Sequence, residues 1–148
     1  ISYGLEKMSV VAVLLVSTGA IAGIIKASSL TDALISVLGQ GEGARLLLAP
    51  LAGAIMSAAT ASTTAGATIA SASFAPTILA SGISAVWGAA LVNVGATVLD
   101  HLPHGSFFRA TGGAVGMNIK QRRRLLPYES AVGLVLTVCS VVTYLIIG

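Results

Sequence analysis

The sequence predicts an all-α, polytopic transmembrane helical protein with a re-entrant helical hairpin and a broken transmembrane helix. Three observations indicate this class. Only 9% of the 148 residues are charged and 55% are hydrophobic, whereas soluble domains carry about 25% charged residues. Residues 46–99 contain no Lys, Arg, Asp or Glu. The 17 glycines suit helices that pack closely in a bilayer, because small residues let backbones approach one another.

The first 40 residues predict one span and one interfacial helix. Residues 8–25 carry no charge and would form about 27 Å of helix, enough to cross the hydrocarbon core. Residues 28–38 place apolar side chains at i, i+3, i+4, i+7 and i+8 from Leu30, with Asp32 on the other side. This pattern is typical of an amphipathic helix that lies along the membrane surface.

Residues 46–80 predict a re-entrant hairpin. Its first arm, residues 46–59, would be only about 21 Å long as a helix, which is short for a full span. The arms are joined by a hydroxyl-rich stretch, since residues 57–73 include eight Ser and Thr. Irregular backbone at membrane depth is tolerated where protein or a water-filled cavity satisfies its polar groups. We therefore expect the tip of the hairpin, Thr60–Thr64, to face a cavity.

Residues 83–118 predict a transmembrane helix that is broken near Pro103, because proline lacks the amide hydrogen and disfavours helix in the preceding residue. Residues 128–147 predict a last span, with no charge after Glu129. Between them lies a basic run, Lys120–Arg124. Beside a span, such a run indicates the cytoplasmic side of the membrane rather than nucleic-acid binding. We predict that residues 1–148 form a single transmembrane domain.

The hydroxyl cluster at the hairpin tip is the strongest chemical signal. Hydroxyls and freed amides at the ends of facing half-helices can bind a carboxylate, and helix N-terminal dipoles favour an anion. Alternatively, these side chains pack helices and bond to carbonyls four residues earlier, and Asn93 bonds to a neighbouring helix. The predicted substrate-binding residues are Thr60, Ser62, Thr63, Thr64, Asn93 and Ser106.

A second signal consists of Asp100, His101 and His104. Ionisable groups at membrane depth are functional by default, and histidine exchanges a proton near neutral pH, so we predict that these residues couple transport to protons. The alternative is a solvated loop at the membrane surface. Their spacing is unspecific for a metal, and we predict no metal and no cofactor. No Ser-His-Asp order, phosphate loop or metalloprotease motif indicates an enzyme.

Two stretches, ATASTTAGATIASASFAPTIL (residues 59–79) and LVNVGATVLDHLPHGSFF (residues 91–108), carry a family resemblance. With the basic run and the last span, they make nearly the whole chain resemble the C-terminal half of the gluconate permease family, within the ion-transporter superfamily. Members carry His-Val-Asn-Asp-Ser-Gly-Phe-Trp where this chain has His101 to Phe108. His101 and Phe107 match, whereas Pro103 and His104 replace the Asn and Asp, which leaves a different carboxylate, such as a short hydroxy acid or citrate, open as the substrate.

The resemblance implies half of an inverted-repeat transporter that carries a gluconate-like sugar acid or another hydroxycarboxylate, with protons, across the inner membrane of a bacterium. Its predicted partners are the organic anion, protons and the lipid bilayer. Because the chain starts at Ile1 without an initiator Met, we expect it to begin within a longer protein. The alternative is a small helical membrane protein that acts as a structural or pore-forming homo-oligomer through its Gly, Ala and Ser faces.

Overall fold

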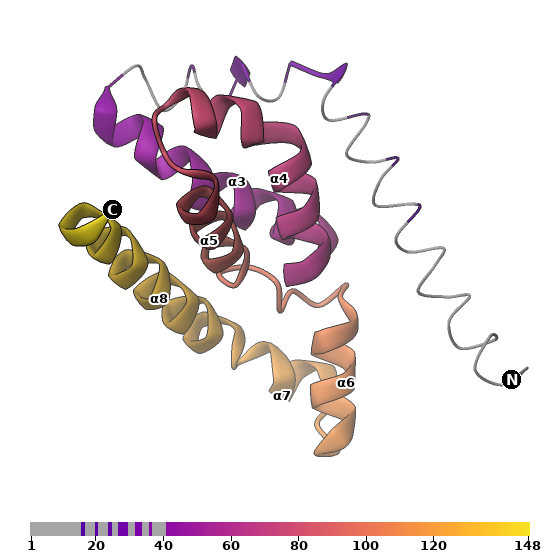
Figure 1. Cartoon of the computed structure of the whole chain (residues 1–148). Coiled ribbons are helices and arrows are strands. Elements are labelled where there is room, and N and C mark those ends of the chain that lie inside the picture. The colour runs from indigo at the N-terminus through magenta and orange to yellow at the C-terminus, as the bar shows by residue number, and fades with distance from the viewer. Residues whose placement is uncertain are drawn as a thin grey trace, which may run out of the picture.

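The computed structural model describes residues 41–148 and, before them, positions 16, 20, 24, 27–29, 32, 33 and 36. Apart from those positions, the predicted span 8–25 and the predicted interfacial helix 28–38 lie outside the described residues. Residues 41–148 form helices and turns with no strand, so the all-α prediction is confirmed (Figure 1). The helices are α3 (Glu42–Thr60), α4 (Thr63–Ala80), α5 (Ala85–Ala96), α6 (Ser106–Ala114), α7 (Ile119–Arg123) and α8 (Leu126–Ile147).

The helices α3 and α4 form a hairpin with a two-residue turn. Ala61 ends α3 in the left-handed conformation, with φ of 46°, and Ser62 is extended. The hydroxyl of Ser62 caps α4 by accepting from the backbone amide of Ala65, at 3.3 Å. The two backbones nearly touch, because a Cβ placed on Gly66 would lie 2.5 Å from the Cα of Ser57. The small residues of this stretch therefore allow the hairpin to close.

Helix α5 packs against both arms of the hairpin (Figure 1). Gly53 and Gly95 sit at its crossing with α3, where a Cβ on either glycine would collide with a backbone carbonyl, that of Val92 or Pro50. The core between the three helices is apolar and tightly filled. Its members are Leu48, Ala49, Ala52, Met56, Ile69, Ala70, Phe74, Ile78, Ile83, Leu91 and Val92.

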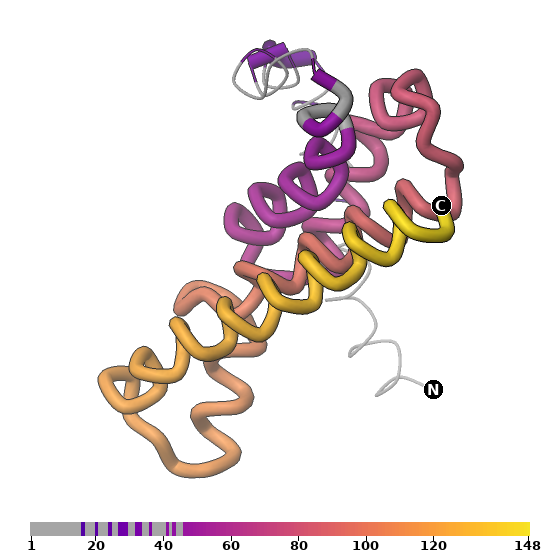
Figure 2. The backbone as a smooth tube through the Cα atoms, turned by 90° about the vertical axis from the view of Figure 1, so that its left-hand side faces the viewer, coloured from indigo at the N-terminus to yellow at the C-terminus, as the bar shows by residue number. Residues whose placement is uncertain are grey.

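Helix α8 runs alongside α5 in both views (Figures 1 and 2). A Cβ on Gly133 would lie 2.7 Å from the carbonyl oxygen of Thr97, and the rings of Trp87 and Tyr144 meet edge to face at 5.3 Å. Within the part of the chain that the structure describes, residues 119–147 are the one helical stretch long and apolar enough to cross a membrane. Only 6% of its most apolar window is buried, so most of its surface faces outward.

Helix α5 ends at Ala96, and α6 begins at Ser106, after nine intervening residues. The intervening segment includes Pro103, and it returns to helix at Gly105, the N-cap of α6. Helices α6 and α7 lie together at one end of the molecule (Figures 1 and 2). The segment between α5 and α6 therefore lies between the three-helix core and this end, where it can reach the hairpin tip and α8.

Candidate functional site

The hairpin tip and the break between α5 and α6 are in direct contact. A Cβ placed on Gly105 would lie 2.6 Å from the Cβ of Ala61, so only glycine fits without a shift. Beside this contact, the hydroxyl of Thr63, the first residue of α4, donates to the Oδ2 atom of Asp100. The carboxylate thus lies at the N-terminal end of α4, where the helix dipole favours a negative charge.

Asp100 is also linked to α8 through His101. The Nδ1 atom of His101 lies 3.2 Å from Oδ1 of Asp100, and its Nε2 atom lies 3.0 Å from Oγ of Ser130. An ionised carboxylate only accepts hydrogen bonds. When the imidazole is neutral, its hydrogen therefore lies on Nδ1 and Ser130 donates to Nε2. We call these four residues, Thr63, Asp100, His101 and Ser130, the polar chain; it joins α4, the break and α8.

The polar chain borders an open pocket of about 350 Å³. His101 is only 2% exposed and the Asp100 side chain is 23% exposed, so the pocket reaches a pair of ionisable groups that is mostly shielded from solvent. The pocket is lined by Thr97, Asp100, His101, Phe107, Tyr128, Glu129, Val132, Gly133 and Leu136. Of the predicted tip residues none lines it, and Thr63 reaches it only through Asp100.

The other predicted site residues lie elsewhere or have local roles. The hydroxyl of Thr60 donates to the carbonyl of Met56, at 2.9 Å, as the packing alternative expects. Ser62 caps α4, and Thr64 is exposed. Asn93 on α5 is exposed, as are His104 and Ser106. Of the nine residues, the structure therefore brings three together: Thr63, Asp100 and His101.

A second polar cluster lies one residue away along α8, and we call it the arginine cluster. Arg122 is 2% exposed and makes two hydrogen bonds to the carboxylate of Glu129, at 2.8 and 2.7 Å. Its Nε atom donates to the hydroxyl of Thr111, at 3.0 Å. The guanidinium also lies 5.0 Å from the ring centre of Phe108. The bidentate pair and the bond to Thr111 fix α6 and α7 to the start of α8.

Sequence reasoning missed Ser130 and Arg122. In the sequence, Arg122 belongs to the basic run. Glu129 is a lone carboxylate at the start of an apolar helix, and a lone charge at that position indicates that a partner of opposite charge lies nearby. Ser130 carried no signal, since serines are common in apolar spans. Asp100 and Ser130 are also far apart in the sequence, so the sequence does not indicate that both contact His101.

Ser130, His101 and Asp100 are bonded in the order of a hydrolase triad, although the sequence suggested none. In a triad the nucleophile must face the substrate. Ser130 is absent from the residues that line the pocket, whereas Asp100 and His101 line it. The polar chain therefore presents to the pocket an acid and a base rather than a nucleophile. Among the described residues, no three His, Cys, Asp or Glu side chains come close enough to hold a metal ion.

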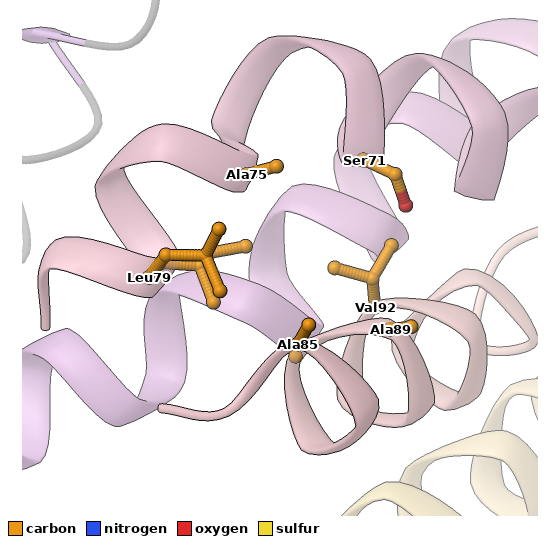
Figure 3. Close-up of a pocket in the computed structure, with 8 residues that line it drawn as sticks. Ser71, Ala75, Leu79, Ala85, Ala89 and Val92 are labelled. Atoms are coloured by element: carbon orange, nitrogen blue, oxygen red, sulfur yellow. The ribbon is translucent and has the colours of Figure 1, made fainter. Parts of the chain in front are cut away.

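A second groove, of about 100 Å³, lies between α4 and α5 (Figure 3). Its walls are made of small and apolar side chains, and Ser71 is the one hydroxyl in view. The groove is lined by Ser71, Ala75, Ile78, Leu79, Ala85, Gly88, Ala89 and Val92. It has the character of a helix-packing surface, so the candidate site is the pocket beside the polar chain.

Comparison with known proteins finds a relative that is named as a transporter. The chain is 53% identical over 141 residues to a protein of Haemophilus influenzae named "uncharacterized transporter". The match covers 95% of this chain and 34% of the relative, so the chain spans about a third of the relative's length. No family model matches the chain, and no solved structure matches it.

Proposed function

We propose that this chain is part of a secondary transporter that carries a small organic anion together with protons across the inner membrane of a bacterium. The observation that carries the proposal is the polar chain, which joins a hairpin tip and a helix break at an open pocket. Midplane sites formed by interrupted helices are the usual arrangement in secondary transporters. The relative named as a transporter supports the class, and the resemblance to gluconate permeases supports a sugar acid or another hydroxycarboxylate as the substrate.

The surface of α8 supports a membrane location. A core helix of a soluble protein is mostly buried, whereas only 6% of the most apolar window in residues 119–147 is buried. Its exposed residues include Val132, Val135, Leu145 and Ile146. Burying such a surface in lipid is favourable by about 25 cal/mol per Å². We therefore propose a multi-pass protein in which α8 faces lipid and the polar chain faces inward.

The substrate carboxylate would bind at Thr63. Its hydroxyl is the one tip hydroxyl that points to the break, and it already holds a carboxylate, that of Asp100. A hydroxyl at a helix N-terminus is suited to an anion because both the hydrogen bond and the dipole favour negative charge. Asn93 and Ser106 are exposed and could contact a larger substrate only if other segments enclose them.

The test uses the full-length protein in proteoliposomes and a counterflow screen with labelled gluconate, citrate and lactate. We expect saturable exchange of at least one of them. Thr63→Val should lower this exchange by about tenfold or more, because a hydrogen bond to a charged group contributes about 1.5–3 kcal/mol. Thr63→Ser should retain it. Thr68→Val is the matched control, since the Thr68 hydroxyl is exposed and bonds to the carbonyl of Thr64.

Two results would contradict the proposal. The first is Thr63→Val exchanging a carboxylate as fast as the wild type at equal expression. The second is a flux that does not saturate and shows no counterflow, which would favour the alternative, a pore-forming oligomer. The small-residue groove between α4 and α5 is the feature that favours such an assembly.

A further inference from the structure

Asp100 occupies the position that the proposed function gives to the substrate. Its Oδ2 atom accepts from Thr63, and its Oδ1 atom lies at 3.2 Å from Nδ1 of His101. Both oxygens of Asp100 therefore have a hydrogen-bonding partner within the protein. Thr63 has a single hydroxyl hydrogen, so it can serve only one carboxylate at a time.

We propose that Asp100 is a built-in competitor of the substrate anion, and that one proton on the Asp100–His101 pair releases Thr63 for the substrate. This inference rests on the proposed function and explains how a proton becomes obligatory. Two carboxylates at one site repel each other strongly, as in sites where paired acids share a proton. While the pair carries its negative charge, a second anion is excluded. Once the pair has gained a proton, its net charge changes from −1 to zero.

The proton belongs to the pair rather than to one residue. It binds either to Nε2, which gives an imidazolium beside a carboxylate, or to the carboxylate itself. Ser130 suits both states, because a hydroxyl donates to a bare Nε2 and accepts from a protonated one. The 3.0 Å contact between Ser130 and Nε2 is thus retained when the pair changes charge. The pocket borders both members of the pair, since Asp100 and His101 line it.

The other charged groups near the pocket either are paired or do not line it. On α8, Glu129 lines the pocket, but both its oxygens are held by Arg122 of α7, and Tyr128 is uncharged at neutral pH. Helix α4 has no charged residue. Arg109 of α6 and His104 of the break are exposed and do not line the pocket. When His101 is neutral, Asp100 is therefore the carboxylate of the pocket wall that is not paired with a cationic side chain.

The consequence is a fixed order of events. One proton binds to the pair, Thr63 turns from Asp100 to the substrate carboxylate, and the site carries one proton and one anion across. On the other side the anion leaves, the proton leaves, and Asp100 returns to Thr63. No anion binds tightly without the proton, because Asp100 then holds the hydroxyl. This order prevents transport of the anion without a proton.

The experiment measures the affinity of the purified full-length protein for labelled gluconate, with labelled citrate as a second probe, from about pH 6 to about pH 8. Wild-type affinity should fall about tenfold per pH unit above the midpoint, because one proton is bound with each anion. Asp100→Asn lacks the competing charge. It should bind more tightly than the wild type at about pH 8, by about tenfold, and should exchange substrate but not accumulate it along a proton gradient.

Asp32→Asn is the matched control, since Asp32 is exposed, and it should follow the wild type. A merely structural Asp100 would give weaker binding in Asp100→Asn at every pH, and that result overturns the inference, as does an unchanged pH slope. If Asp100→Asn does not fold, His101→Gln decides: binding should be weak and flat at about pH 6 to 8, and a wild-type slope overturns the inference. A wild type that exchanges no carboxylate instead contradicts the proposed function itself.

Discussion

The start of α8 is held by two polar connections of opposite character. Ser130 bonds to the polar chain, and Glu129, the residue before it, bonds to the arginine cluster. The arginine cluster is a bidentate ion pair whose guanidinium stays charged at any physiological pH. The polar chain contains a histidine, the side chain that changes charge near neutral pH. Neighbouring residues of one helix thus connect to a permanent charge pair and to a changeable one.

This difference teaches how a membrane protein can keep a helix in place while a charge beside it changes. If α8 were held by the polar chain alone, each proton binding event would alter its attachment. The arginine cluster fixes α6 and α7 to α8 independently of the proton. In the proposed mechanism, the polar chain is then free to respond to protons and substrate at the pocket.

The largest effect is expected from breaking the arginine cluster. Arg122→Ala leaves the Glu129 carboxylate and the Thr111 hydroxyl without their buried partner, and should cost about 3 kcal/mol or more of stability. Thermal unfolding of the purified protein measures this loss. Arg123→Ala is the matched control, because Arg123 is exposed and should change stability by less than about 0.5 kcal/mol.

The double variant Arg122→Met with Glu129→Leu distinguishes a lost partner from a lost interaction. Replacing both charges by apolar side chains removes the unpaired carboxylate, and it should recover most of the stability that Arg122→Ala loses. If the double variant is as unstable as Arg122→Ala, the ion pair itself carries the stability. If Arg122→Ala and Arg123→Ala unfold at the same temperature, the arginine cluster does not hold α8.

A smaller effect is expected where the hairpin tip meets the break. Gly105→Ala would place its Cβ 2.6 Å from that of Ala61 and against the carbonyl of that residue. It should cost about 1–3 kcal/mol, as overpacking does, and should push Asp100 away from Thr63. Gly112→Ala is the matched change in the arginine cluster. Its Cβ would lie 3.5 Å from Cγ of Arg122, an ordinary contact.

Gly112 is inside α6, so alanine there should be neutral or stabilise by up to about 1 kcal/mol. Thermal unfolding and carboxylate exchange of the two variants provide the comparison. Gly105→Ala should lose both stability and exchange, and Gly112→Ala should keep both. Equal unfolding temperatures of the two variants would show that the tip and the break are not tightly packed together.

The sequence predicts the helices more readily than the contacts between them. An apolar, Gly-rich chain with few charges implies helices, because these satisfy their own backbone hydrogen bonds, and residues 41–148 form helices joined by turns. The pairing of Thr63 with Asp100 joins residues 37 positions apart, and it depends on the fit of Gly105 against Ala61. Nothing local to either residue encodes that fit.

The same limit explains why the sequence does not distinguish the hydroxyls of the hairpin tip from one another. Thr60, Ser62 and Thr63 look alike in the sequence, but one bonds within its helix, one caps the next helix, and one points to the break. Ala61, which is left-handed at the turn of the hairpin, sets these directions. Composition distinguishes the stretch from the rest of the chain, whereas the backbone turn decides which side chain of that stretch can meet Asp100.

The smallest effect is expected at Ser130, and it tests the role of the polar chain most directly. Ser130→Ala leaves the buried Nε2 atom of His101 without its partner and should cost about 1–2 kcal/mol. Ser130→Thr keeps the hydroxyl and should keep the stability. Ser140→Ala, on the same helix, is the matched control, because no hydrogen bond of its side chain is found among the described residues.

The pH dependence of the stability lost in Ser130→Ala shows which protonation state of His101 the Ser130 hydroxyl supports. A hydroxyl that donates to neutral His101 and accepts from charged His101 supports both states about equally. Ser130→Ala should therefore lose similar stability at about pH 6 and about pH 8, and the midpoint of gluconate binding should stay close to that of the wild type. If the loss appears on only one side of the midpoint, Ser130 serves a single protonation state. The polar chain would then stabilise one charge state of His101, as the arginine cluster stabilises one charge state of its ion pair, instead of supporting both states.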